Sequence, residues 1–142
     1  MGKNMRKFES LTKYLYAIDL DDIGTVVYNP KKEGHSLELP YVKYTDMVYL
    51  FIKDVYDFSD KNKDSGIDRY DLILHEYGIE KGGIPLDSVD VSKMDGRGVM
   101  ALIMAVVRAE RFYEGTLRAA FKKGIMRKWL ERLKEIDSIQ MP

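Results

Sequence analysis

The sequence predicts a mainly α-helical fold, with five or six helices packed around a central buried helix at about residues 96–113 and a small β-hairpin near residues 24–40. The central helix follows from nine consecutive apolar residues, VMALIMAVV, at 99–107. A helix that is apolar on every side has to be surrounded by other elements. Several other segments repeat apolar residues at spacings of three and four, which is typical of amphipathic helices that could surround it.

The elements are expected in the following order. A first helix at about 7–20 carries an apolar stripe, and it is followed by the hairpin, whose strands are indicated by the β-branched residues at 25–28 and by the alternation of Leu37 and Leu39 with polar residues. Thr45 is expected to cap the next helix, and Gly78 to end the one at 68–77. The central helix is expected from Ser92 or Asp95 to Glu114, with Gly115 ending it. A short helix that runs to Gly124 follows, and the last helix is expected from Ile125 to Asp137.

Length and composition bound the class of protein. A chain of 142 residues with 45% apolar and 32% charged residues is expected to form a single domain, 1–142. It contains no cysteine, which excludes a disulfide framework, a thiolate zinc site and a cysteine nucleophile. The longest apolar run is too short to span a bilayer, and the N-terminus lacks the apolar run of a secretory signal. We therefore expect a cytoplasmic protein without membrane contact.

No cofactor is expected, because the sequence contains no glycine-rich phosphate-binding loop and no serine nucleophile motif. His35 and His75 are isolated and do not show the spacing of zinc ligands.

The charged residues that follow the apolar run are the first candidate site. On an ideal helix Arg108 and Arg111 lie about 60° apart, whereas Glu110 lies about 160° from Arg108. The favoured interpretation is structural, with both arginine stems covering apolar neighbours and the charged ends reaching water or an aspartate. The alternative is a site in which the two arginines bind a carboxylate or phosphate and Glu110 acts as an acid or base. Any buried charge among the three is expected to find its partner on another element.

The segment 60–71, DKNKDSGIDRYD, is similar to the calcium loops of EF-hand and dockerin modules. Its possible ligands are Asp60, Asn62, Asp64, Asp68 and Asp71. Ser65 stands where the sharp turn needs glycine, and Asp71 is one methylene shorter than the usual bidentate glutamate. The favoured interpretation is an acidic connector between helices, with Asp68 as a helix N-cap.

Charge is unevenly distributed although the net charge is zero. Residues 54–90 contain ten acids and four bases, a net charge of −6, while residues 116–142 contain seven bases and three acids, a net charge of +4. A nucleic-acid interface at the basic C-terminal segment would need Trp129 for stacking. Trp129 shares the core-facing stripe of its helix with Leu133 and Ile136, so nucleic acid is not favoured as a partner.

Ten tyrosines and eight methionines are more prominent than any motif. Tyr16, Tyr49 and Tyr56 fall beside the apolar stripes of their helices, and exposed tyrosines are common at protein interfaces. We therefore expect a protein-interaction or accessory module without catalytic activity, bound to a protein partner or to a second copy of the chain. The alternatives are an anion-binding or small-molecule-binding protein or enzyme that uses Arg108, Glu110 and Arg111 and, less favoured, a calcium-binding loop.

Several motifs also resemble a bacterial family of unknown function. They are LTKY at 11–14, DRY at 68–70, DVSKMD at 90–95, VRAERFYEG at 107–115 and KWLERLKEID at 128–137, of which VRAERF and WLxRLKEID are the most specific. The resemblance spans nearly the whole chain and implies a free-standing cytoplasmic bacterial domain. It assigns no functional residue.

Overall fold

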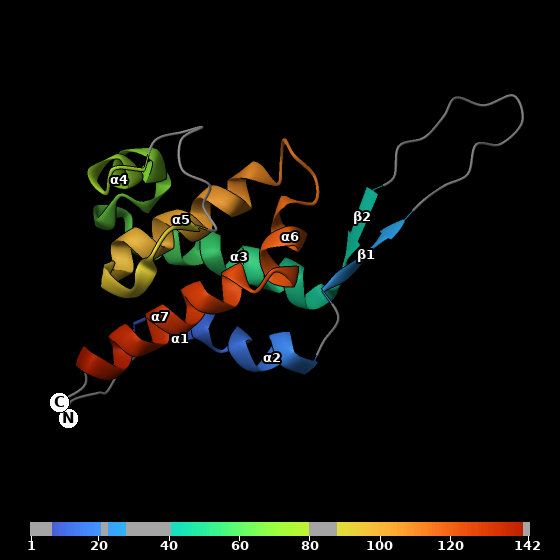
Figure 1. Ribbon diagram of the computed structural model, residues 1–142, viewed down its shortest axis with the longest axis horizontal. Coiled ribbons are helices and arrows are strands. Elements are labelled where there is room, and N and C mark those ends of the chain that lie inside the picture. The colour runs from blue at the N-terminus through green and yellow to red at the C-terminus, as the bar shows by residue number, and fades with distance from the viewer. Residues whose placement is uncertain (1–6, 21–22, 28–40, 80–87, 141–142) are drawn as a thin grey trace, which may run out of the picture.

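The computed structural model describes residues 7–20, 23–27, 41–79 and 88–140, and within these the fold is built around helix α5 (Gly96–Ala109). Ten of the fourteen residues of α5 are buried. The helices in contact with it are α3 (Asp46–Lys61), α4 (Tyr70–Glu76), α6 (Thr116–Lys122) and α7 (Ile125–Gln140) (Figure 1). The predicted central buried helix is therefore confirmed.

The first predicted helix is present but interrupted. It consists of α1 (Glu9–Thr12) and α2 (Tyr14–Leu20), which Lys13 separates. Tyr14, the first residue of α2, is buried, and its hydroxyl donates a hydrogen bond of 2.5 Å to Asp54 of α3. If α1 and α2 are counted as one helix, the described residues contain six α-helices, in agreement with the prediction.

The last helix packs as its apolar stripe predicts. Trp129, Leu133 and Ile136 of α7 are buried in the same core as α5, and Trp129 is among the most deeply buried large side chains. Asp137, on the same helix, is buried, and its carboxylate accepts a hydrogen bond of 2.9 Å from the backbone N–H of Phe8. This bond ties α7 to the beginning of α1.

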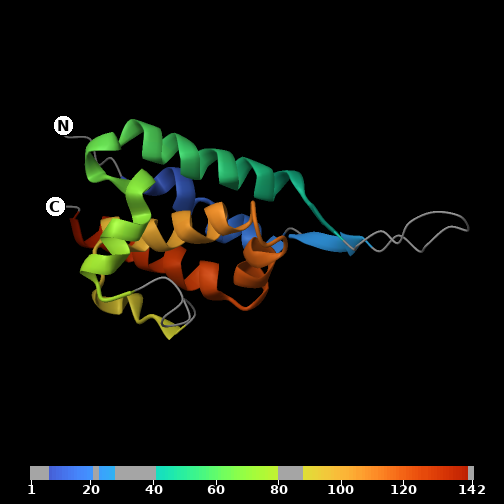
Figure 2. The same cartoon turned by 90° about the horizontal axis from the view of Figure 1, so that it is seen from above.

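The predicted hairpin is confirmed. Strand β1 (Gly24–Val27) pairs antiparallel with β2 (Tyr41–Tyr44), with Gly24 opposite Tyr44 at one end and Val27 opposite Tyr41 at the other. Leu37 and Leu39, which were expected in the second strand, lie outside the described residues. Figure 2 shows that the two strands extend away from one end of the helical body.

The predicted end of the central helix at Glu114 is wrong. Helix α5 ends at Ala109, and residues 110–115 form a turn that leads into α6. In place of a further helical turn, the side chain of Glu110 binds the backbone N–H groups of Gly115 and Leu117, which stabilises the turn. Gly115, with a φ of +96°, completes this turn in a conformation that favours glycine.

Two short 3₁₀ helices, η1 (Lys63–Ser65) and η2 (Ile67–Arg69), connect α3 to α4, and a third, η4 (Val91–Lys93), precedes α5. The N-cap residue of α4 is Arg69 and not Asp68, so the predicted cap is wrong. No helix in the described part of the chain combines the length and apolar character needed to cross a bilayer.

Candidate functional site

The best-defined polar site in the structure is the turn between α5 and α6, which Glu110 holds together. The Glu110 carboxylate accepts hydrogen bonds from the backbone N–H groups of Gly115, at 3.1 Å, and Leu117, at 2.8 Å. It also accepts a hydrogen bond from the hydroxyl of Tyr44 on β2. One half-buried side chain therefore binds the turn, the start of α6 and the hairpin at once.

The hairpin is attached to the same turn by two further contacts. The Tyr44 hydroxyl accepts a hydrogen bond of 3.1 Å from the backbone N–H of Arg118, and the Glu114 carboxylate accepts one of 3.0 Å from the backbone N–H of Val42. Burial of Tyr44 and its hydrogen bond to Glu110 raise the pKa of the Tyr44 hydroxyl well above its ordinary value. A tyrosine hydroxyl is protonated at physiological pH even with its ordinary pKa, so this hydroxyl is a donor to Glu110.

Arg108 and Arg111 lie against aromatic rings and point away from the contacts of Glu110. The Arg108 guanidinium is 5.9 Å from the ring centroid of Tyr70 at the start of α4, and that of Arg111 is 5.5 Å from the ring of Tyr56 on α3. Such cation–π contacts contribute roughly 0.5–1 kcal/mol at exposed sites. The hydrogen-bond donors to Glu110 belong to β2, the turn and the start of α6, and neither arginine is among them. A ligand bound by the two arginines stays a prediction.

Two aromatic residues of the turn were not identified from the sequence. The exposed fractions of Phe112 and Tyr113 are 80% and 73%, although both directly follow a buried helix. The sequence pattern placed them inside the helix that was expected to reach Glu114. Because α5 ends at Ala109 instead, the side chains of Phe112 and Tyr113 lie in the turn and are exposed to solvent.

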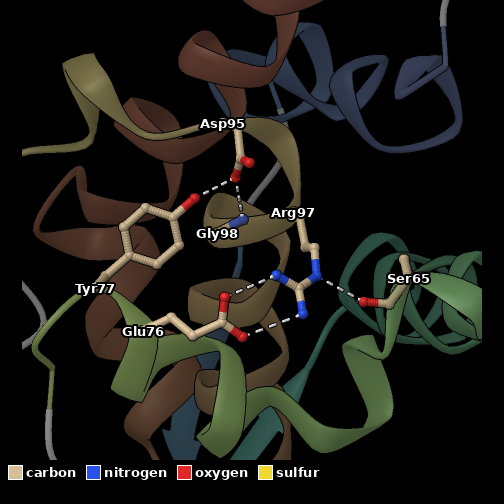
Figure 3. Close-up of polar contacts among 6 residues, drawn as sticks. All are labelled: Ser65, Glu76, Tyr77, Asp95, Arg97 and Gly98. Atoms are coloured by element: carbon tan, nitrogen blue, oxygen red, sulfur yellow. Dashed lines mark hydrogen bonds and ion pairs between the residues drawn. The ribbon is translucent and has the colours of Figure 1, made fainter.

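A second polar cluster lies at the beginning of α5 (Figure 3). Asp95 is the N-cap residue of α5, and its carboxylate accepts a hydrogen bond of 2.9 Å from the backbone N–H of Gly98. It also accepts one from the hydroxyl of Tyr77, which follows α4. A Cβ atom on Gly98 would lie 2.8 Å from the Tyr77 ring, so only glycine lets the ring approach the helix this closely.

Arg97 extends this cluster to the 3₁₀ helices. Its Nε donates a hydrogen bond of 2.8 Å to the backbone carbonyl of Ser65, and its terminal nitrogens contact the Glu76 carboxylate at 3.3 and 3.4 Å (Figure 3). The contacts shown in Figure 3 therefore connect the beginning of α5 to the preceding helices, which is a structural role.

The Asp95 contacts predict a specific pH dependence of stability. Burial alone would raise the pKa of Asp95, but hydrogen bonds from Tyr77 and Gly98 and the nearby charge of Arg97 outweigh it and lower this pKa. Because the folded-state pKa is the lower one, the stabilisation is present above the unfolded-state pKa and is lost as the pH falls through the folded-state value.

Asp95→Asn keeps a capping oxygen but removes the charge. We expect the free energy of unfolding of wild type to fall more than that of Asp95→Asn between pH 7 and pH 3, as measured by urea denaturation. The difference should stay below about 1 kcal/mol, because solvent screens a carboxylate that is this exposed. Parallel pH profiles for the two proteins would contradict this prediction.

The loop at 60–71 forms a compact connector. The Asn62 amide donates a hydrogen bond of 2.8 Å to the carbonyl of Phe58, and the Ser65 hydroxyl donates one of 2.5 Å to the carbonyl of Asn62. Gly66 adopts a φ of +77°, one position later than in a calcium loop. Among the residues that the structure describes, no three His, Cys, Asp or Glu side chains are grouped so that they could hold a metal ion. Calcium binding by Asp60, Asn62, Asp64, Asp68 and Asp71 stays a prediction.

Trp129 in the basic C-terminal segment is only 2% exposed, so its ring is not available to stack on a nucleic-acid base. Lys128 and Lys134 are exposed on the opposite side of α7, as the amphipathic pattern predicts. The expectation that Trp129 belongs to the core is confirmed.

The fold and these contacts define a class: a helical protein built around one buried helix, in which the ionisable residues next to that helix hold its ends to neighbouring elements. The chain belongs to the family described as "Family of unknown function (DUF6508)", whose model matches residues 3–138. This confirms the resemblance to a family of unknown function. No curated protein and no solved structure matches the chain.

Proposed function

We propose that this protein is a protein-interaction module, and that Phe112 and Tyr113 in the α5–α6 turn anchor its partner. The observation that carries the proposal is the exposure of these two adjacent aromatic side chains, 80% and 73%. Burial of exposed aromatic area is a large source of binding energy, and aromatic residues are enriched among the residues that dominate interface energetics.

The turn displays the two side chains on a well-ordered backbone. The N–H groups of Phe112 and Tyr113 donate hydrogen bonds of 3.0 and 2.8 Å to the carbonyl of Ala109, and the N–H of Thr116 donates one of 3.1 Å to the carbonyl of Tyr113. The bonds of Glu110 to Gly115 and Leu117 close the same turn. A preorganised backbone lowers the entropy lost on binding, so more of the contact energy is available for affinity.

The hairpin enlarges the apolar part of this surface. Val26 and Tyr41 are 52% and 42% exposed, and β2 is held to the turn by the hydrogen bond from Val42 to Glu114. The partner would therefore contact both the turn and the hairpin. We place this module in the bacterial cytoplasm as a single domain, 1–142, in keeping with the motifs quoted above.

The alternative, an anion-binding protein or enzyme that uses Arg108, Glu110 and Arg111, is less favoured. Glu110 accepts hydrogen bonds from Gly115, Leu117 and Tyr44, which leaves little capacity for a proton-transfer role beside the two arginines.

The test compares two double variants that each remove two exposed apolar side chains. Phe112→Ser with Tyr113→Ser alters the proposed anchor. Leu72→Ser with Ile139→Ser, at sites that are 52% and 70% exposed, is the matched control. Proteins crosslinked to each form in cells would be quantified by mass spectrometry, the strongest candidate purified, and its affinity measured by calorimetry. Light scattering would measure self-association.

We expect the anchor variant to weaken binding at least about tenfold, which corresponds to about 1.4 kcal/mol, while the control binds as wild type does. Equal binding by both variants would overturn the proposal. So would a wild-type protein that is strictly monomeric and for which no crosslinked protein binds after purification.

A further inference from the structure

A cavity of about 300 Å³ lies between the hairpin and α6, and Arg118 of the basic C-terminal segment is one of its lining residues. Its lining residues include Val26 and Val42 from the two strands, Glu114 from the turn, and Arg118 and Ala119 from α6. Its volume falls at the lower end of the range for small-molecule sites.

Arg118 has no counter-charge within the described residues. Its Nε atom is buried and lacks a hydrogen-bond partner, and no described carboxylate forms an ion pair with its guanidinium. The two neighbouring acids bind backbone N–H groups, since Glu110 accepts from Gly115 and Leu117 and Glu114 accepts from Val42, and neither forms a salt bridge with Arg118 within the described residues. No described carboxylate therefore competes with a ligand for the terminal nitrogens of this guanidinium, and an anionic acceptor there would form charge-assisted hydrogen bonds.

The burial of Nε determines which nitrogens of the Arg118 guanidinium can bind an anion. Because Nε is shut off from solvent, the terminal Nη atoms are the part of the guanidinium that can reach a ligand in the cavity. The backbone N–H groups of Leu117 and Arg118 donate to Glu110 and Tyr44, so they do not contribute to the site. The planar pair of Nη donors matches the two oxygens of a carboxylate.

We propose that this cavity binds a small organic monocarboxylate, whose carboxylate contacts Arg118 and whose apolar part lies against Val26 and Val42. Glu114 at the same cavity disfavours ligands with a second negative charge, such as dicarboxylates and phosphates. The carboxylate can belong to a free acid or to the C-terminus of a peptide. This inference does not depend on Phe112 or Tyr113, and although Val26 also belongs to the surface proposed for the protein partner, a titration with a small acid tests it without that partner.

The test is a titration of the ¹⁵N-labelled protein with 3-phenylpropanoate, followed by NMR. We expect saturable shifts of the Arg118 Nε–H signal and of the backbone amides of Val26, Val42 and Ala119. The matched amide, 3-phenylpropanamide, keeps the apolar part without the charge and should bind at least ten times more weakly. An acetylated tetrapeptide with an apolar last residue, as free acid and as amide, distinguishes a peptide C-terminus from a free acid as the source.

Arg118→Met should lower the affinity for the acid at least tenfold, and Arg118→Lys should lower it less. Lys122→Met, which removes an exposed charge from the same helix, should leave it unchanged. Equal shifts with acid and amide would overturn the proposal, and this comparison needs no variant to fold. Equal affinity of Arg118→Met and wild type, or the absence of saturable shifts with both acids, would overturn it as well.

Discussion

Glu110→Ala is expected to lower the free energy of unfolding by about 3 kcal/mol, since three donors lose their acceptor at once. The backbone N–H groups of Gly115 and Leu117 and the hydroxyl of Tyr44 all donate to this carboxylate. Hydrogen bonds to charged groups contribute about 1.5–3 kcal/mol each, but water can replace part of them at a half-buried site. Urea denaturation at pH 7 measures the change.

Two further variants separate this explanation from a general loss of charge. Tyr44→Phe should cost less in the Glu110→Ala background than in wild type, because its acceptor is already gone. Glu135→Ala removes an exposed carboxylate that pairs with Arg132 on the same helix, and should change stability by less than about 0.5 kcal/mol. A Glu110→Ala protein that is as stable as Glu135→Ala would show that Glu110 does not hold the turn.

Gly96→Ala is expected to lower the free energy of unfolding by about 2 kcal/mol, despite the higher helix propensity of alanine. Gly96 is buried at the first position of α5, and a Cβ atom there would lie 2.7 Å from Cε2 of the Phe8 ring and nearer still to its Cζ. Phe8 cannot easily move away, because it is itself buried and stacks on Phe58 with ring centroids 5.4 Å apart.

A double-mutant cycle tests whether this clash is the cause. Phe8→Leu alone should be destabilising, but it should shrink the penalty of Gly96→Ala because the shorter side chain vacates the ring position. Denaturation of the four proteins measures the coupling. Strictly additive changes in the free energy of unfolding would contradict a direct contact between residues 8 and 96.

The burial of the central helix could be predicted because it depends on a property of the segment itself. Nine consecutive apolar residues cannot be placed on one side of a helix, so the other elements have to surround it. The apolar stripe of α7 predicted the burial of Trp129 for the same local reason. The stop at Gly78 could be predicted because it acts on residues next to it in sequence, whereas the start of α5 was narrowed only to Ser92 or Asp95, of which Asp95 is the N-cap residue.

The end of α5 could not be predicted, because residues 110–114 carry no helix-breaking signal. Glu110 is an ordinary helix former, and one of the groups that it binds in the turn belongs to Tyr44, which lies far away in sequence. For that reason Phe112 and Tyr113 were assigned to a helix although they are exposed in a turn. The same applies to Arg118, whose missing counter-charge depends on where Glu110 and Glu114 direct their oxygens.

The amino-acid sequence alone determined the helical class, the central buried helix, the hairpin and most of the helix boundaries, because periodicity and capping are local properties of the chain. The tertiary structure decided the partners of the charged groups: Arg108 and Arg111 lie over the rings of Tyr70 and Tyr56, whereas Glu110 faces the hairpin and α6. The partner of an ionised side chain depends on which distant elements the folded core brings beside it, and helical spacing carries no information about those elements.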